Sequence, residues 1–328
     1  MASNLKIVYA PKTMSQEGWA ILNARPDVRA IPFDNMVSSA DFRAAMAETG
    51  AHAAVLGVTP FGEPELEAAR HMQVVARIGV GYDAIDVPAL SKARVPLMIA
   101  GTANSASVAE CAMFMMISLA KRWSDLDRAV KENRWLDRWV FVPSDLLDKQ
   151  LLIVGFGRIG TRTAKRALAM EMKVAVYDPY VPAETIKAAG CMPAQDLDAA
   201  LAQADFVTLH CPKTPQTVGL INAARLARMK PSAFLVNTAR GGIVDEDALH
   251  AALTAKKLAG AGLDVFDKEP PEPANPLLKL PNVLCAPHMA GVTKEAMDRM
   301  AIAATKNVLS VFDGAPIVEN VINRDVLA

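Results

Sequence analysis

Short runs of apolar residues recur along the chain and alternate with segments whose apolar positions recur every three or four residues. The runs predict buried strands, and the segments between them predict amphipathic helices. Regular alternation of the two favours a parallel sheet covered by helices. In the first hundred residues the predicted strands are Lys6–Tyr9, Val28–Ile31, Ala53–Val58, Gln73–Arg77 and Val95–Ile99.

Capping residues predict where two helices begin. Asp41 is expected to cap a helix that runs to Glu48 and stops at Gly50. Ser107 and Glu110 have the spacing of a capping box and are expected to open a helix that is apolar on every side. A helix without a polar face must be buried, either between domains or between subunits.

The apolar run Leu151–Val154 leads directly into three glycines with the spacing G-x-G-x-x-G. Gly155 permits a tight turn after the strand, and Gly157 lets the backbone approach a pyrophosphate. Gly160 lets the following helix pack close to the strand, and the N-terminus of that helix offers its N–H groups to phosphates. The pattern therefore predicts a dinucleotide-binding site.

An acidic residue ends the next predicted strand, which begins at Lys173. Asp178 lies 18 residues after Gly160, where a carboxylate can accept hydrogen bonds from an adenosine ribose. Because a carboxylate at this position repels a 2′-phosphate, NAD is favoured over NADP as the cofactor.

Polar side chains follow the ends of the later strands. His210, Arg240, Asp264 and His288 each come at or shortly after the end of a predicted strand. Ligands of open α/β sheets bind beyond the carboxyl ends of the strands. We therefore expect these four side chains at one edge of the sheet.

The predicted fold class is α/β, with two Rossmann-like or flavodoxin-like parallel-sheet domains and a cleft between them. Residues 1–101 and 293–328 are expected to form the substrate-binding (catalytic) domain, because the C-terminal helix is assigned back to the first sheet. Residues 102–292 are expected to form the NAD-binding Rossmann domain. A length of 328 residues agrees with two domains.

The net charge argues against nucleic acid and membranes as partners, and the cysteine content indicates the cellular compartment. Lys plus Arg and Asp plus Glu both number 35, so no net charge attracts nucleic acid or an anionic membrane. The four cysteines are scattered without disulfide or metal spacing, which is typical of a reducing compartment. The N-terminus has no signal-peptide pattern, and the longest apolar run, Cys111–Ala120, is too short to span a bilayer. We expect a cytoplasmic protein without a metal site.

A nicotinamide cofactor supplies hydride, so the protein must hold a carbonyl group and handle one proton. An imidazole such as that of His288 is suited to the proton, and Glu269 could hold that imidazole in place. Arg240 could clamp a carboxylate through its planar guanidinium, and the backbone N–H groups of Val80 and Gly81 could form a second anion site. Taken singly, each could instead be a structural histidine, a solvated glutamate, an ion-pair partner or a plain turn.

Together these segments resemble one family over nearly the whole chain, the D-isomer-specific 2-hydroxyacid dehydrogenases. The resemblance implies hydride transfer between NAD(H) and the carbonyl or hydroxyl carbon of a 2-keto or D-2-hydroxy acid. It also implies that Arg240, Glu269 and His288 are catalytic, and that Val80 and Gly81 bind the substrate together with Arg240 and His288. The matching segments are Gly79–Asp83, Gly155–Gly160, Asn237–Gly242, Gly262–Pro270 and Ala286–His288.

The resemblance further implies a set of NAD contacts and an oligomeric state. Family members typically form homodimers through their NAD-binding domains, with the helix after Ser107 at the centre. Trp123, Trp135 and Trp139 fall close to this helix; packing explains them about as well as an interface does, and we favour the interface. The implied NAD contacts are Gly155, Gly157, Arg158, Ile159, Gly160, Asp178, Cys211, Pro212, Thr238, Ala239, Asp264, His288 and Ala290.

The substrate is less sharply indicated. Enzymes that oxidise 3-phosphoglycerate usually carry an arginine where this chain has Leu56, and Arg77 alone is a poor phosphate clamp. The chain also stops at Ala328, without the C-terminal regulatory domain that some of those enzymes carry. We favour a glyoxylate or hydroxypyruvate reductase, or a reductase of another 2-keto acid, with 3-phosphoglycerate dehydrogenase as the alternative.

Two other branches share this fold. Formate dehydrogenases pair the histidine with a glutamine, so Glu269 argues against that branch. An NAD-sensing interaction module like the C-terminal-binding corepressors is the alternative from another class. Complete cofactor and catalytic motifs favour an enzyme.

Overall fold

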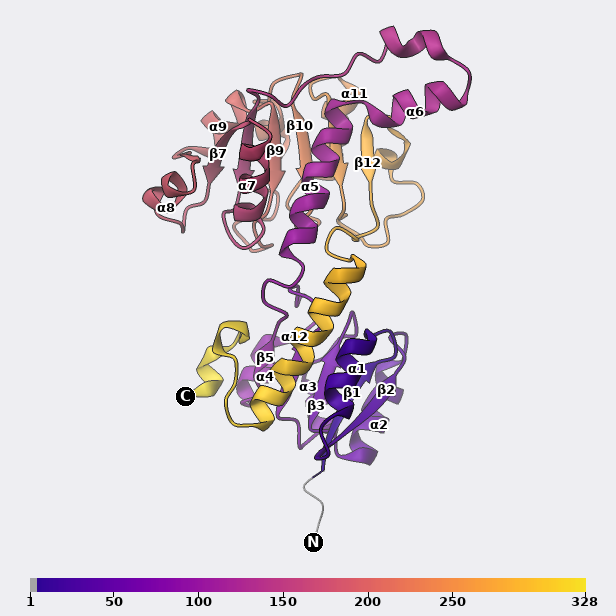
Figure 1. Ribbon diagram of the computed structural model, residues 1–328, viewed down its shortest axis with the longest axis vertical. Coiled ribbons are helices and arrows are strands. Elements are labelled where there is room, and N and C mark those ends of the chain that lie inside the picture. Colours follow the sequence, from indigo (N-terminus) through magenta and orange to yellow (C-terminus); the bar gives the residue numbers. More distant parts are fainter. Residues whose placement is uncertain (1–4) are drawn as a thin grey trace. The chain divides into compact units, whose positions relative to one another are not determined.

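The computed structural model describes residues 5–328, which divide into two compact units. Of the described residues, 5–104 and 292–328 form unit 1, and Ser105–Gly291 form unit 2. Each unit holds one sheet of parallel strands with helices packed against it (Figure 1). The expected α/β fold class is confirmed. Domain boundaries were expected after residues 101 and 292; along the sequence, the division between the compact units falls after Asn104 and Gly291.

The sheet of unit 1 has the strand order β2-β1-β3-β4-β5. Its faces carry separate apolar layers, because successive side chains of a strand point to opposite sides. The C-terminal helix α12 (Lys294–Phe312) packs on the same face as α1 (Gln16–Asn23), which explains why the chain returns to this unit. The strands are β1 (Lys6–Pro11), β2 (Val28–Phe33), β3 (Ala53–Leu56), β4 (Val74–Arg77) and β5 (Leu97–Met98), and the remaining helices are α2 (Ser39–Thr49), α3 (Glu63–Ala68) and α4 (Val87–Lys92).

The start of α2 differs from the prediction. Ser38, not Asp41, is the N-cap residue: its hydroxyl accepts a hydrogen bond from the Asp41 N–H at 3.1 Å. Asp41 lies in the first turn, where its carboxylate also accepts from the Ser38 hydroxyl at 2.7 Å. Ser38 lies three residues before Asp41 and accepts from an N–H group of the first turn, so the helix begins earlier than predicted. Gly50 ends the helix with a φ of 66°, as predicted.

The sheet of unit 2 has seven strands in the order β12-β11-β10-β9-β6-β7-β8. The chain direction across the sheet reverses between β6 and β9, which is the topological switch point where ligands of such sheets bind. The strands are β6 (Gln150–Val154), β7 (Lys173–Tyr177), β8 (Met192–Pro193), β9 (Phe206–Leu209), β10 (Phe234–Asn237), β11 (Gly260–Leu263) and β12 (Val283–Cys285); the helices are α5 (Ser105–Ala120), α6 (Trp123–Lys131), α7 (Gly160–Ala169), α8 (Ala183–Ala188), α9 (Leu197–Gln203), α10 (Ala223–Leu226) and α11 (Glu246–Thr254).

The capping box predicted Ser107 as the N-cap residue, whereas α5 already begins at Ser105. Ser107 lies inside the helix and is buried, so it is not the N-cap residue. Glu110 forms an ion pair with Arg166 of α7 at 2.8 Å instead of closing a box. Tertiary contacts with α7, β10 and β11 decide where this helix lies. Most of its apolar side chains are buried as expected, but Phe114 is 64% exposed.

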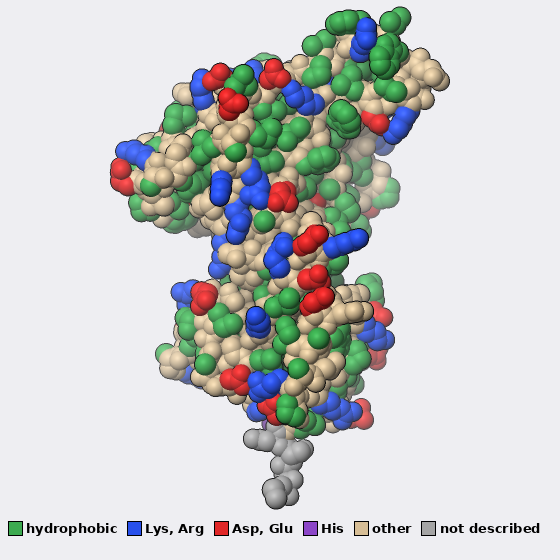
Figure 2. Space-filling model, in the orientation of Figure 1, with side chains coloured by type: hydrophobic (Ala, Val, Ile, Leu, Met, Phe, Trp, Pro, Cys, Tyr) green, Lys and Arg blue, Asp and Glu red, His purple; other side chains and the backbone are tan. Residues whose placement is uncertain are grey.

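A projecting arm follows α5, and we call residues 123–142 the arm. Figure 1 shows α6 and the next segment extending away from the sheet of unit 2. The 3-10 helix η1 (Trp135–Trp139) has no buried residue, and Leu136 is 75% exposed. Apolar side chains gather at this end of the unit in Figure 2. Among residues 5–328, no helix combines the length and apolar character needed to cross a membrane.

The loop after β6 brings two backbones into direct contact. Gly155 has a φ of 97°, a conformation that side chains rarely adopt. A Cβ on Gly160 would lie 2.0 Å from the carbonyl oxygen of Gly155. The helix α7 therefore starts against the end of β6, and only a residue without a side chain permits this.

We expect Gly160→Ala to lower the free energy of unfolding by about 3 kcal/mol, because the methyl group must push one backbone segment away from the other. Chemical denaturation of the cofactor-free protein measures this. Gly157→Ala is the matched control, since a Cβ there would meet no heavy atom within 4 Å. The control should change stability by less than about 0.5 kcal/mol; equal stability of the two variants would contradict the contact.

Candidate active site

The N-terminus of α7 and the loop before it form the first part of the site. Space is open beside Gly157, where a Cβ would touch nothing, so a ligand can approach the backbone closely. Arg158 is exposed and Ile159 half-buried immediately before α7 begins. The helix is long enough for its free N–H groups and positive dipole end to attract phosphate.

Asp178 lies directly after β7 and holds the glycine loop. One carboxylate oxygen accepts a hydrogen bond from the Phe156 N–H at 2.7 Å. The other accepts from the Tyr180 N–H at 2.9 Å. Each oxygen retains a second lone pair for a ribose hydroxyl. The residue predicted to bind the ribose therefore also orients the loop predicted to bind the pyrophosphate.

The ends of β9 and β10 continue the same edge of the sheet. Cys211 lies against Gly155, where a Cβ would be 2.7 Å from the Cys211 nitrogen. Burial raises the pKa of Cys211 to about 11, so its thiol stays protonated. The hydroxyl of Thr238 is buried, and within the part of the chain that the structure describes it has no hydrogen-bond partner. A buried polar atom of this kind fits a bound polar ligand.

His210 also lies at this edge, directly after β9. Its Nε2 is 3.2 Å from the Thr208 hydroxyl, whereas its Nδ1 is buried without a partner among residues 5–328. Burial lowers the pKa of His210 from about 6.5 to about 3, so the imidazole is neutral near pH 7.

Glu269 and His288 form a direct pair in unit 2. Oε2 of Glu269 lies 2.7 Å from Nδ1 of His288, and Oε1 accepts a hydrogen bond from the Phe266 N–H at 3.0 Å. Both oxygens of the carboxylate are thus held, which fixes the imidazole that it contacts. The His288 side chain is 49% exposed.

Asp264 holds the segment that carries His288. Its buried carboxylate accepts hydrogen bonds from the Met289 N–H at 2.7 Å and the Ala290 N–H at 2.9 Å. Its carbonyl oxygen accepts from the His288 N–H at 2.8 Å. Burial raises the pKa of Asp264, and the two backbone donors oppose that shift. These three bonds hold His288 at a φ of 55°, in the left-handed region.

Arg240 follows β10 on a segment that touches the Glu269 loop. Its Nη1 donates to the Ala239 carbonyl at 2.7 Å, and its own carbonyl accepts from the Asn237 amide at 2.9 Å. A Cβ on Gly241 would lie 1.8 Å from the carbonyl oxygen of Phe266, so the two loops are in backbone contact. The structure thus brings the Arg240 segment, Glu269 and His288 to one edge of the unit-2 sheet.

The predicted substrate turn belongs to unit 1. Gly79 has a φ of 143°, and Val80 and Gly81 are half-buried. Among residues 5–328, neither the Val80 N–H nor the Gly81 N–H donates to a backbone carbonyl. Arg77 donates from Nε to the Gly81 carbonyl at 2.9 Å and from Nη1 to the Leu56 carbonyl at 3.4 Å. The turn keeps two donors available while its own carbonyl is held by Arg77.

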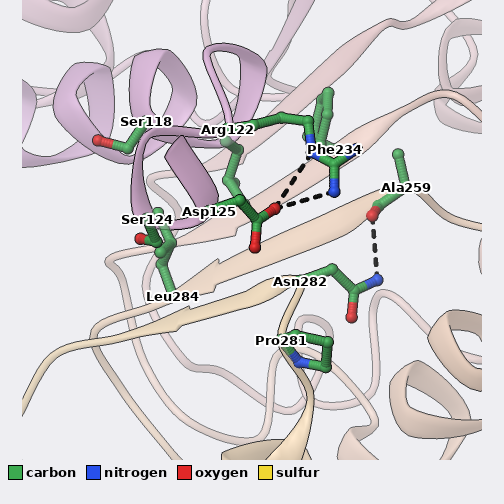
Figure 3. Close-up of a pocket in the computed structure, with 10 residues that line it drawn as sticks. Ser118, Arg122, Ser124, Asp125, Phe234, Ala259, Pro281, Asn282 and Leu284 are labelled. Carbon is green, nitrogen blue, oxygen red and sulfur yellow. Dashed lines mark hydrogen bonds and ion pairs between the residues drawn. The ribbon is translucent and has the colours of Figure 1, made fainter. Parts of the chain in front are cut away.

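A cavity of about 250 Å³ lies at the opposite edge of the unit-2 sheet, near the N-terminal ends of β10 to β12 (Figure 3). Arg122 and Asp125 form an ion pair in its wall at 2.9 Å. The predicted site residues lie at the carboxyl ends of the strands, so this cavity is not part of the candidate active site.

Known proteins resemble this chain in sequence and in fold. The family model for the D-isomer specific 2-hydroxyacid dehydrogenase, NAD binding domain, matches residues 113–290. A glyoxylate reductase of Korarchaeum cryptofilum is 37% identical over 271 residues, which is 82% of this chain and 81% of the relative. The chain belongs to the D-isomer-specific 2-hydroxyacid dehydrogenase family.

Two further comparisons describe the extent of the similarity. A D-3-phosphoglycerate dehydrogenase of Archaeoglobus fulgidus is 40% identical over 258 residues, which is 79% of this chain and 48% of the relative. The chain spans about half the length of the curated D-3-phosphoglycerate dehydrogenases that it matches. The crystal structure of the TT0316 protein from Thermus thermophilus superposes with a TM-score of 0.85 at 29% identity, covering 97% of this chain and all of that one.

The matched family domain binds NAD, so the prediction of NAD as the cofactor is confirmed. The residues of unit 2 fit this cofactor. They offer open space at Gly157, the N-terminus of α7, the Asp178 carboxylate and the buried Thr238 hydroxyl.

We expect acid to destabilise the protein partly through His210. Between pH 6.5 and pH 3 the unfolded chain protonates this imidazole and the folded protein does not. His210 therefore does not reduce the free energy of unfolding above about pH 6.5, and it lowers this free energy progressively as the pH falls below that value. Lowering the pH from 7 to 5 should cost the wild type about 2 kcal/mol more unfolding free energy than His210→Gln, measured in urea at both pH values. Equal losses in the two proteins would contradict the shift.

Proposed function

We propose that the protein is an NAD-dependent dehydrogenase that interconverts a 2-keto acid and a D-2-hydroxy acid. The observation that carries the proposal is the Glu269–His288 pair at the carboxyl edge of the NAD-binding sheet. The Arg240 segment contacts the same loop through Gly241. A proton donor and a carboxylate clamp beside a nicotinamide site are what this reaction requires.

The three side chains divide the work. When bound, NADH supplies hydride for the carbonyl carbon. Because Glu269 occupies Nδ1 of His288, Nε2 is the nitrogen that gives the proton to the carbonyl oxygen, and it takes the proton back in the oxidative direction. Arg240 binds the substrate carboxylate and polarises the carbonyl. The backbone N–H groups of Val80 and Gly81 are proposed to contribute to the same carboxylate.

The proposed NAD contacts follow the edge of the unit-2 sheet. The glycine loop with Arg158 and Ile159 is assigned to the pyrophosphate, and Asp178 to the adenosine ribose. Both carboxylate oxygens of the buried Asp264 accept hydrogen bonds, so we propose that this residue places the His288 segment beside the cofactor. The other proposed contacts are Cys211, Pro212, Thr238, Ala239, His288 and Ala290.

The substrate side chain is proposed to be uncharged. Leu56 lies wholly within the apolar core of unit 1, so it contributes no charge to the site. The contacts of Arg77 with two backbone carbonyls support a role in shaping the turn. We therefore favour a glyoxylate or hydroxypyruvate reductase, or a reductase of another 2-keto acid. Relatives named D-3-phosphoglycerate dehydrogenase at 39–40% identity keep that activity as the second candidate.

A keto-acid panel tests the function. NADH oxidation is followed with glyoxylate, hydroxypyruvate, pyruvate, phenylpyruvate and 3-phosphohydroxypyruvate, and each assay is repeated with NADPH. We expect turnover with NADH of a keto acid whose side chain is uncharged, whereas preference for the phosphorylated acid would select the second candidate. Binding of NADH without any turnover would instead support an NAD-sensing interaction module.

His288→Ala should lower kcat by about 10²–10⁴-fold, far more than it weakens NADH binding, because a general acid acts mainly on the proton. Arg240→Lys should also be strongly impaired, since an ammonium cannot bind a carboxylate in the bidentate geometry. His250→Ala is a matched control on α11, away from the site. An unchanged kcat in His288→Ala would remove this residue from the mechanism.

We also propose that two copies associate through their NAD-binding units. The arm presents Trp135, Leu136 and Trp139 with exposed fractions of 61%, 75% and 72%. Exposed apolar side chains gathered in this way mark interaction sites, and Phe114 of α5 is also exposed. A second copy of the chain is the proposed partner because the family resemblance implies a homodimer.

Replacing Trp135, Leu136 and Trp139 by serine should convert a dimer into a monomer without loss of folded structure, because these side chains contribute nothing to the core of unit 2. Light scattering coupled to size-exclusion chromatography measures the mass. A wild-type protein that is monomeric at high concentration, or a dimer that persists in the triple variant, would contradict this interface.

A further inference from the structure

Asp267 joins the loop that carries Arg240 to the loop that carries Glu269. Its carboxylate accepts a hydrogen bond from the Gly242 N–H at 2.5 Å. Gly242 has a φ of 80°, so the segment after Arg240 turns in a conformation that favours glycine. The bond lies next to the backbone contact between Gly241 and Phe266. Two adjacent contacts thus set the distance between these loops.

Glu246 anchors Asp267 from the other side. Its Oε1 accepts from the Asp267 N–H at 2.6 Å, and its Oε2 accepts from the Asn275 amide at 2.8 Å. Glu246 is the first residue of α11, where the positive end of the helix dipole favours a carboxylate. Leu249 and Leu253 bury this helix in the core of unit 2. The anchor therefore belongs to a rigid element.

Hydrogen bonds connect α11 to the proposed active site in a continuous series. It runs from Glu246 to Asp267 and then to Gly242, two residues after Arg240. Asp267 is also two residues before Glu269, whose carboxylate holds His288. The guanidinium and the imidazole lie on separate loops, so their spacing depends on what ties the loops together.

We propose that Asp267 and Glu246 are positioning residues that set Arg240 relative to the Glu269–His288 pair. The inference rests on the proposed function, because it assigns these two carboxylates to the geometry of the same site. The two residues are 21 positions apart in the sequence, so no local sequence pattern unites them. Small displacements of a substrate-positioning group reduce rates strongly, by about 10²-fold for 1 Å.

Asp267→Ala tests the proposal. We expect the KM of the best keto acid to rise about 10-fold, because Arg240 loses its placement. The Kd for NADH and the pH dependence of kcat should stay as in the wild type, since the glycine loop and the Glu269–His288 pair are untouched. Asp267→Asn should restore KM to within about 3-fold, because its amide oxygen still accepts from the Gly242 N–H. Mere structural damage would not spare NADH binding or be rescued by asparagine.

Glu246→Ala should act in the same direction, and the double variant should lose little more than Asp267→Ala alone, because both break the same series of bonds. Asp247→Ala is the matched control, an acid in the same helical turn, and should behave as the wild type. A KM for Asp267→Ala equal to that of the control, or failure of Asp267→Asn to rescue, would overturn the inference.

Oxalate binding to the protein–NADH complex, measured by calorimetry, supplies a readout that needs no turnover. Asp267→Ala should weaken it about 10-fold. If the wild type turns over no keto acid yet oxalate binding falls in this way, the proposed reaction fails and the positioning role stands. If the wild type is active and both KM and oxalate affinity are unchanged in the variant, only the positioning role fails.

Discussion

The buried carboxylate of Asp264 is the contact on which the His288 segment depends. Asp264 accepts three hydrogen bonds, two at its carboxylate from Met289 and Ala290 and one at its backbone carbonyl from His288, and these place the backbone of the segment. Hydrogen bonds to a charged acceptor are stronger than neutral ones, and burial makes an unpaired donor costly. The imidazole can therefore present a defined nitrogen while nearly half of its side chain is exposed. Order at this site comes from the end of β11 and not from the histidine itself.

Direct contact between backbone segments fixes two other loops at this edge of the unit-2 sheet. Gly160 lies against the carbonyl of Gly155, and Gly241 lies against that of Phe266. In the first place the start of α7 touches the end of β6, and in the second the loop after β10 touches the loop after β11, with no side chain between them. Such contacts permit little relative movement, because close-packed backbone cannot yield as a flexible side chain can. The glycine loop before α7 and the loop that carries Arg240 are therefore both held by direct backbone contact.

Carboxylates at this edge have separate tasks. Asp178 orients the glycine loop, Asp264 holds the His288 segment, and Glu269 holds the imidazole. Asp267 and Glu246 tie the loops to each other and to α11. Each of these carboxylates accepts at least one hydrogen bond from a backbone N–H group. Acidic residues near this proposed active site therefore support its loops.

The amino-acid sequence by itself determined the α/β class, the NAD-binding motif and the family, because periodic apolar runs and the glycine spacing are local patterns with a direct mechanical meaning. It also placed His210, Arg240, Asp264 and His288 at the ends of strands whose carboxyl ends share one edge. The starts of α2 and α5 were predicted wrongly, because Ser38 and the contacts of α5 compete with the residues that the motif rules selected. The pairing of Glu269 with His288 was expected from the sequence, and the structure supplies its distance. Only the tertiary structure decided that Asp264 is bonded to the next segment and that Asp267 bridges two loops. Those contacts join residues on different strands and loops, and their geometry depends on how the chain packs, which no local pattern encodes.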